Sequence, residues 1–115
     1  MILDKVNSPD DLKKLSVREM NTLSDEMREL IIKKVNTTGG HMGPNLGIIE
    51  ATIAMHYVFN SPVDKIVFDV SHQCYPHKIL TGRKEVFTDP DKYHKYTGYT
   101  APEESEHDIF KVGHK

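Results

Sequence analysis

Between residues 17 and 35, apolar side chains recur at intervals of three and four, the spacing of one face of an α-helix. Ser16 stands directly before this run and Glu19 three residues further on, a pattern typical of a capping box at a helix N-terminus. Gly39 and Gly40 follow, and glycine readily takes the left-handed conformation that ends a helix. The sequence therefore predicts one long amphipathic helix between Ser16 and Gly39. Its apolar positions are Val17, Met20, Leu23, Met27, Leu30, Ile31 and Val35.

Three shorter helices are predicted on similar grounds. Residues 8–15 open with a serine cap followed by proline and two acidic residues, which favours a helix start. An apolar stretch from about residue 46 or 47 to 59 predicts the second, which the segment Asn-Ser-Pro at 60–62 ends. The third begins near residue 75 or 76 and ends by Gly82.

The pattern predicts one or two short strands. Residues 66–70 are apolar except for Asp69, which is typical of a strand covered on both faces of a parallel sheet. Residues 109–112 predict at most a weak second strand, and residues 89–105 are polar and rich in turn formers, as in a surface loop. One short strand cannot satisfy its own backbone hydrogen bonds, and two strands remain marginal. We therefore expect the isolated chain to be marginally folded and to need strands from elsewhere.

The composition of the chain limits the number of domains, the binding partners and the cellular compartment to be expected. The 115 residues suffice for one domain, and the net charge of −2 gives no overall attraction to nucleic acid or to an anionic membrane. The first residues lack the long apolar run of a signal peptide or membrane span. Cys74 is the single cysteine, which excludes an internal disulfide and favours a reducing cytoplasm. We expect a cytoplasmic protein whose partners include neither nucleic acid nor membrane.

A polar and basic cluster follows the predicted strand within residues 65–83. In open α/β sheets ligands bind beyond the carboxyl ends of the strands, so this is where an anionic ligand is expected. The cluster comprises His72, Gln73, His77, Lys78 and Arg83.

A second candidate site is the loop at residues 39–47, which holds four glycines and a histidine between two predicted helices. Glycine lets a backbone approach a ligand closely, and the next helix offers its N-terminus to an anion. Equally, Gly39 and Gly40 could only end one helix while Asn45 caps the next. His41, between glycine and methionine, has little to pack against, which favours a role as a proton-transfer group or hydrogen-bond donor.

Other interpretations of the histidines and the cysteine stay open. His72, Cys74 and His77 could be zinc ligands, but their spacing fits no common finger pattern and a fourth ligand would come from afar. Cys74 could be a nucleophile activated by a histidine, although a small apolar role in packing is favoured. His56 lies in an apolar helix and is interpreted as a core or interface histidine.

Several motifs together resemble the 1-deoxy-D-xylulose-5-phosphate synthase family. They lie at residues 38–47, 54–59, 69–83, 104–110 and 113–114, in the family's order and approximate spacing. The resemblance implies an α/β fold, an incomplete N-terminal part of a thiamine-diphosphate-binding, transketolase-like domain that is mostly helical with one or two short strands. It divides residues 1–115 into N-terminal helices 8–59, a strand and cofactor-facing segment 65–83, a loop 89–108 and a truncated motif 109–115.

The family's activity follows as an implication of the resemblance. Its members transfer a two-carbon unit from pyruvate to glyceraldehyde 3-phosphate with loss of carbon dioxide, which feeds isoprenoid, thiamine and pyridoxal synthesis. Thiamine diphosphate and Mg²⁺ are the implied cofactors, and a homodimer or a complementing chain is the implied assembly. By the same resemblance His41 is the catalytic histidine that assists proton transfer, while His72, Gly113 and His114 line the cofactor.

The chain also departs from the family. Ser71 stands where glycine is usual, so a tight backbone approach is altered, and Lys115 replaces serine or threonine. The Gly-Asp-Gly segment and later asparagine that bind magnesium, and the glutamate that activates the cofactor, do not occur. No metal ligand is therefore assigned, and we expect a fragment that is inactive alone. The alternative is a non-catalytic interaction piece that completes a split enzyme, with the helix at residues 17–35 as its docking face.

Overall fold

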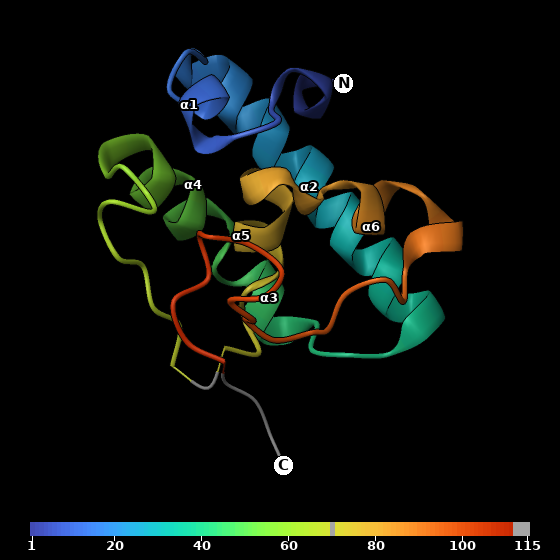
Figure 1. Cartoon of the computed structure of the whole chain (residues 1–115). Helices are drawn as coiled ribbons and strands as arrows, with labels where there is room; N and C mark the ends of the chain where they lie inside the picture. The colour runs from blue at the N-terminus through green and yellow to red at the C-terminus, as the bar shows by residue number, and fades with distance from the viewer. Residues whose placement is uncertain (70, 112–115) are drawn as a thin grey trace.

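A computed structural model describes residues 1–69 and 71–111, and within them the regular secondary structure is helical (Figure 1). Across these two ranges, no helix combines the length and the apolar character needed to cross a membrane. The elements in chain order are η1 (Ile2–Lys5), α1 (Pro9–Leu12), α2 (Val17–Thr38), α3 (Gly43–Leu46), α4 (Ile49–Val58), α5 (Tyr75–Lys78), η2 (Ile79–Arg83), α6 (Glu85–Thr88) and η3 (Pro90–Lys92).

The long helix α2 confirms the prediction at both ends. The Ser16 hydroxyl accepts a hydrogen bond from the Glu19 backbone N–H at 3.1 Å, and the Glu19 carboxylate accepts one from the Ser16 N–H at 3.0 Å. This reciprocal pair is the predicted capping box. At the other end Gly39 has φ +78°, a conformation that glycine adopts without steric cost. The helix ends there because the next residues cannot continue its geometry.

The shorter helices agree with prediction in place and differ in detail. The helix expected from residue 46 or 47 to 59 is two helices, α3 and α4, separated at residues 47–48. The helix expected over 75–82 forms as α5 and the wider turn η2, in which Gly82 has φ +93°. The helix α1 occupies part of the predicted range 8–15.

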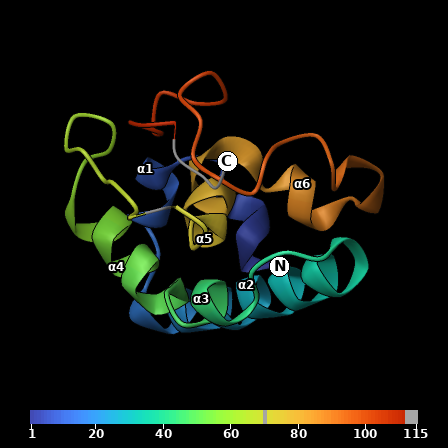
Figure 2. The ribbon, with the colours of Figure 1, turned by 90° about the horizontal axis from the view of Figure 1, so that it is seen from below.

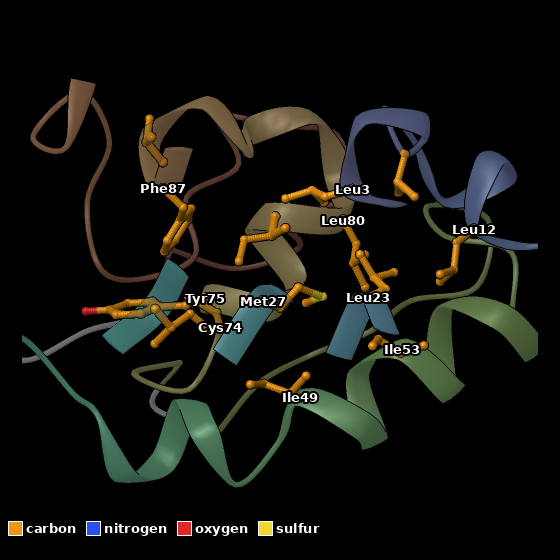
Figure 3. Close-up of a cluster of buried hydrophobic side chains, with 14 of the residues drawn as sticks. Leu3, Leu12, Leu23, Met27, Ile49, Ile53, Cys74, Tyr75, Leu80 and Phe87 are labelled. Carbon is orange, nitrogen blue, oxygen red and sulfur yellow. The ribbon is translucent and has the colours of Figure 1, made fainter. Parts of the chain in front are cut away.

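The core gathers side chains from all parts of the described chain. α5 lies between α4 and α6 (Figures 1 and 2), and side chains from these helices and from α2 meet in one buried cluster (Figure 3). Most of the apolar stripe of α2 is used here and is not free to dock another chain, whereas Val17 at the start of the helix is 71% exposed. The stripe residues that are buried are Leu23, Met27, Ile31 and Val35.

The predicted strands are not present in the described residues. Residues 65–69 are assigned no strand, Val70 lies outside the described residues, and Ile66 and Phe68 are buried while Val67 is 53% exposed. This alternation places one side of the segment against the helices and leaves the other side open. Residues 109–111 are not a strand either, and Val112 lies outside the described range. The physical reason is the one that made two strands marginal, since a lone extended segment has no neighbour for its ladder of hydrogen bonds.

The predicted surface loop at 89–105 is wrong in part. Its first residues form η3, and Tyr93, Thr100 and Ala101 are no more than 5% exposed. The segment after η3 returns past α5 (Figure 1), where the Thr97 carbonyl accepts a hydrogen bond from the Lys78 Nζ. It is polar in sequence because several of its polar groups bind buried partners on α5 and η2.

Candidate functional site

The structure brings His41 and His72 together from two separate segments. His41 lies in the glycine-rich loop after α2, and His72 lies in the turn that precedes α5. Their ring centroids are 4.9 Å apart with the rings tilted by 41°, and the Tyr99 ring stands edge-on to His41 at 6.1 Å. Both histidine residues are partly buried, and the Nδ1 atom of His72 is among the buried ring atoms. Gly113 and His114, the other predicted cofactor-lining residues, lie outside the described residues.

Asn45 connects the two histidine segments. Its side chain is completely buried, and its Nδ2 donates to the backbone carbonyls of His41 and His72, the latter at 2.9 Å. Its Oδ1 accepts from the backbone N–H of Tyr75 at 2.9 Å. The sequence suggested Asn45 only as a possible local helix cap; in the structure it instead joins three segments.

The Tyr75 side chain occupies the space that a side chain would need at two nearby glycines. A Cβ at Gly40 would lie 2.6 Å from the Tyr75 hydroxyl oxygen, and one at Gly98 would lie 3.1 Å from it. Gly40 also has φ +123°, which side-chain-bearing residues rarely adopt. The tyrosine therefore fills the space that these glycines leave, and the loop that carries His41 packs closely against α5.

Ser71 adopts a left-handed backbone conformation that glycine takes more readily than serine. Its φ is +62°, in the left-handed region that disfavours most side chains. Its hydroxyl accepts a hydrogen bond from the backbone N–H of Thr100 at 3.1 Å, and both residues are buried. Ser71 thus combines an unfavourable backbone geometry with a hydrogen bond that its hydroxyl accepts.

Lys78 and Arg83, predicted to bind an anionic ligand, bind carboxylates of the same chain. The Lys78 Nζ is 2.8 Å from Glu104 Oε1, and the Arg83 guanidinium contacts Glu104 at 2.9 Å and both oxygens of Asp108 at 2.7 Å. Lys78 is 1% exposed and Arg83 3% exposed. Their charges are neutralised inside the protein, so the prediction of an external anion at these two residues is wrong.

A buried pair of histidines continues this network. His77 Nε2 lies 3.0 Å from Asp108 Oδ1, and His77 Nδ1 lies 2.9 Å from His56 Nε2. The contacts are satisfied when His77 donates from Nε2 to the carboxylate and accepts at Nδ1 from His56. Burial, reinforced by His77, lowers the pKa of His56 to about 3, so His56 is neutral near neutral pH. His56 is therefore a core histidine, as predicted.

The Asp108 carboxylate stays charged despite its burial. Burial by itself raises the pKa of Asp108, but hydrogen bonds from Arg83, His77 and the Ala101 N–H outweigh this and hold that pKa well below its usual range. These partners tie the segment around residue 108 to η2 and α5. Hydrophobic periodicity does not reveal such a link, and the only local signal is the group of acidic residues between positions 103 and 108, of which Glu104 and Asp108 make the buried ion pairs.

The zinc and nucleophile interpretations find no support in the described residues. Across 1–69 and 71–111, no group of three or more histidine, cysteine, aspartate or glutamate side chains is placed to hold a metal ion. Cys74 is fully buried, and burial raises the pKa of its thiol to about 12. The thiolate that a nucleophile needs is therefore suppressed, and Cys74 packs in the core (Figure 3).

Comparison of the sequence with known proteins identifies the family of this chain. Relatives described as 1-deoxy-D-xylulose-5-phosphate synthase include those of Caldanaerobacter subterraneus subsp. tengcongensis, 54% identical over 113 residues, and Dictyoglomus thermophilum, 54% identical over 114. The alignments cover 98% and 99% of this chain but 18% of each relative. A third relative of the same description, from Halothermothrix orenii, is 51% identical over 98% of this chain. A sequence model of that family matches residues 3–115, so this chain belongs to the 1-deoxy-D-xylulose-5-phosphate synthase family.

Proposed function

We propose that this chain supplies the His41–His72 part of a thiamine-diphosphate site in a 1-deoxy-D-xylulose-5-phosphate synthase. That enzyme would join pyruvate to glyceraldehyde 3-phosphate with loss of carbon dioxide. The observation that carries the proposal is the 4.9 Å approach of the two half-buried imidazole rings from segments 31 positions apart in sequence, 41 to 72. The family membership supplies the reaction.

The described residues fit one side of such a cofactor. Two partly buried imidazoles beside a loop of glycines suit the reactive ring, because an imidazole can both donate and accept a hydrogen bond and can transfer a proton. The Gly-Asp-Gly segment and the later asparagine that hold magnesium in the family do not occur in this sequence. In this proposal magnesium and the diphosphate are therefore held by residues outside these 115.

In this proposal the histidines have distinct tasks. Thiamine diphosphate, when bound, supplies the carbanion chemistry. His41 would take up or deliver the proton at the reacting carbon, and His72 would contact and orient the cofactor. Since this chain spans 18% of its relatives' length, we expect the isolated 115 residues to form no product from the two substrates.

The test is a chimaeric enzyme in which this chain replaces the matched 113-residue segment of the Caldanaerobacter relative. The purified chimaera should convert pyruvate and glyceraldehyde 3-phosphate to 1-deoxy-D-xylulose 5-phosphate. His41→Ala in the chimaera should lower kcat by about 100-fold or more, the range lost with a proton-transfer group. The exposed His94 provides the matched control, because His94→Ala should leave kcat unchanged. A folded His41→Ala chimaera with undiminished turnover would refute the proposal.

A second candidate is a non-catalytic interaction piece of a split enzyme. It is favoured by large apolar side chains left exposed at the end of α4 and after it. They are Tyr57, Val58, Phe59, Val63 and Val67. In this case the 115-residue chain, mixed with the remainder of the Caldanaerobacter enzyme as a separate polypeptide, should restore turnover and co-elute with it. Turnover by the fused chimaera together with no turnover by the mixture of separate chains would count against this candidate.

A further inference from the structure

Asn45 makes contacts that a local helix cap would not make. Its side-chain amide reaches the backbone carbonyl of His41, four residues back, and that of His72, 27 positions onward. The same amide accepts from Tyr75, 30 positions onward. One buried side chain therefore links the glycine-rich loop, the turn before α5 and the start of α5.

The chemistry of the three partners determines which atom of the amide faces which partner. Carbonyl oxygens only accept hydrogen bonds, so the atom that contacts His41 and His72 must be the donating nitrogen. The Tyr75 N–H only donates, so the atom facing it must be the oxygen. Both amide protons of Asn45 are thereby used, and the orientation is the single one that satisfies all three partners.

The hydrogen bond from the Tyr75 N–H to Asn45 also satisfies a backbone donor at the start of α5. A helix leaves its first N–H groups without internal partners, and Cys74, at the N-cap of α5, makes no side-chain cap. Asn45 therefore acts as a cap from a distance. The histidine-bearing turn is thus fastened at its carbonyl by Nδ2 and, three residues later, by Oδ1.

We propose that Asn45 is a positioning residue, which holds His41 and His72 in their mutual arrangement for the chemistry of the site. This inference rests on the proposed function. A displacement of about 1 Å at a reacting group can cost about 100-fold in rate, so a residue that sets the spacing of two site histidines contributes to turnover without touching the substrate.

The wild-type chain tests the geometry directly by NMR. Scalar couplings across hydrogen bonds should join Asn45 Nδ2 to the carbonyl carbons of His41 and His72. The Asn45 side-chain protons should exchange slowly with solvent, and the two imidazole rings should show mutual nuclear Overhauser effects. Absence of the couplings in a 115-residue chain whose α2 amides exchange slowly, and which is therefore folded, overturns the proposal. If the isolated chain does not fold, the turnover of the chimaeric enzyme, described below, decides it.

Two substitutions separate positioning from general stabilisation. In Asn45→Asp the side chain still accepts from Tyr75 but can donate to at most one carbonyl, and only when protonated. Asn45→Ala removes all three contacts. The His41–His72 Overhauser effects should be lost in both variants, whereas protection of the Tyr75 amide from exchange should persist in Asn45→Asp and be lost in Asn45→Ala. Asn36→Asp, on the exposed side of α2, is the control.

The chimaeric enzyme links this geometry to turnover. Asn45→Asp should lower kcat by at least about tenfold, while Asn36→Asp leaves it unchanged. A folded Asn45→Asp variant that keeps the ring contacts or the full kcat overturns the positioning role alone. Full turnover by His41→Ala counts instead against the proposed function, so the two failures are distinguishable.

Discussion

Arg83 and Asp108 face each other through two hydrogen bonds of 2.7 Å, one from each terminal guanidinium nitrogen to a separate carboxylate oxygen. Arg83 is 3% exposed and Asp108 4% exposed, so the pair is shielded from water. Such fork-to-fork geometry combines two charge-assisted hydrogen bonds in one plane. The pair joins η2 to the segment around residue 108, 25 positions further along the chain.

Removing one partner of this pair should be costly. Asp108→Asn keeps the side-chain shape but leaves the buried guanidinium of Arg83 short of a counter-charge, and we expect a loss of about 3 kcal/mol in the free energy of unfolding. Urea denaturation measures it. The exposed pair of Glu103 and Lys111, 3.1 Å apart, offers the control, since Glu103→Gln should produce no measurable loss. Equal effects of the two substitutions would argue against a stabilising role for the buried pair.

Stability should fall as the pH drops from about 6.5 toward 3, partly because of His56. Its pKa is lowered from 6.5 to about 3 in the folded chain, chiefly by burial. The unfolded chain therefore binds a proton on His56 throughout this window while the folded chain does not, which favours unfolding as the pH falls. At about 1.36 kcal/mol per pKa unit, the full effect is on the order of 5 kcal/mol.

Urea denaturation at a series of pH values measures this dependence. His56→Gln removes the titrating group, so the stability of the variant should change less steeply with pH between about 6.5 and 4. The exposed His94 is again the control, and His94→Gln should follow the wild-type curve. A His56→Gln curve parallel to that of the wild type would contradict the assignment.

Substitutions at Ser71 should separate its backbone conformation from its hydrogen bond. Ser71→Gly relieves the left-handed geometry but deprives the buried Thr100 N–H of its partner. Ser71→Ala loses the hydrogen bond and keeps the unfavourable backbone. We expect the alanine variant to be less stable than the glycine variant by about 1 kcal/mol, measured by thermal unfolding. Equal stability of the two variants would show that the backbone conformation is not strained.

Gly40 lies in the loop after α2 and Gly43 is the first residue of α3, and the two should respond differently to alanine. A Cβ at Gly40 meets the Tyr75 hydroxyl on a backbone with φ +123°, whereas a Cβ at Gly43 meets nothing within 4 Å. Gly40→Ala should lower the free energy of unfolding by at least about 2 kcal/mol, and Gly43→Ala should have little effect. Combining Gly40→Ala with Tyr75→Phe should recover part of the loss, since the contacted hydroxyl is gone. A double-mutant cycle that shows no coupling would contradict this contact.

Short-range patterns in the sequence determined a large part of the helical architecture. The capping box of Ser16 and Glu19, the helical spacing of the apolar stripe and the glycine at position 39 predicted α2 nearly to the residue. Each of these signals acts within about one helical turn, so the sequence alone expresses it. His41 and His72 could likewise be singled out, because each stands beside residues that suit a ligand-binding segment.

The tertiary structure decided the features that depend on distant partners. The strand expected at residues 66–70 is absent from the described part, since a strand needs a neighbour that local pattern cannot supply. The sequence around Lys78 and Arg83 predicted an anion-binding site, but in the structure the carboxylates of Glu104 and Asp108 neutralise the two positive charges. The bridging role of Asn45 was equally invisible, because its partners at His72 and Tyr75 lie 27 and 30 positions away. Hydrogen bonds between segments this far apart follow no sequence period, and they form only once the helices between them have packed.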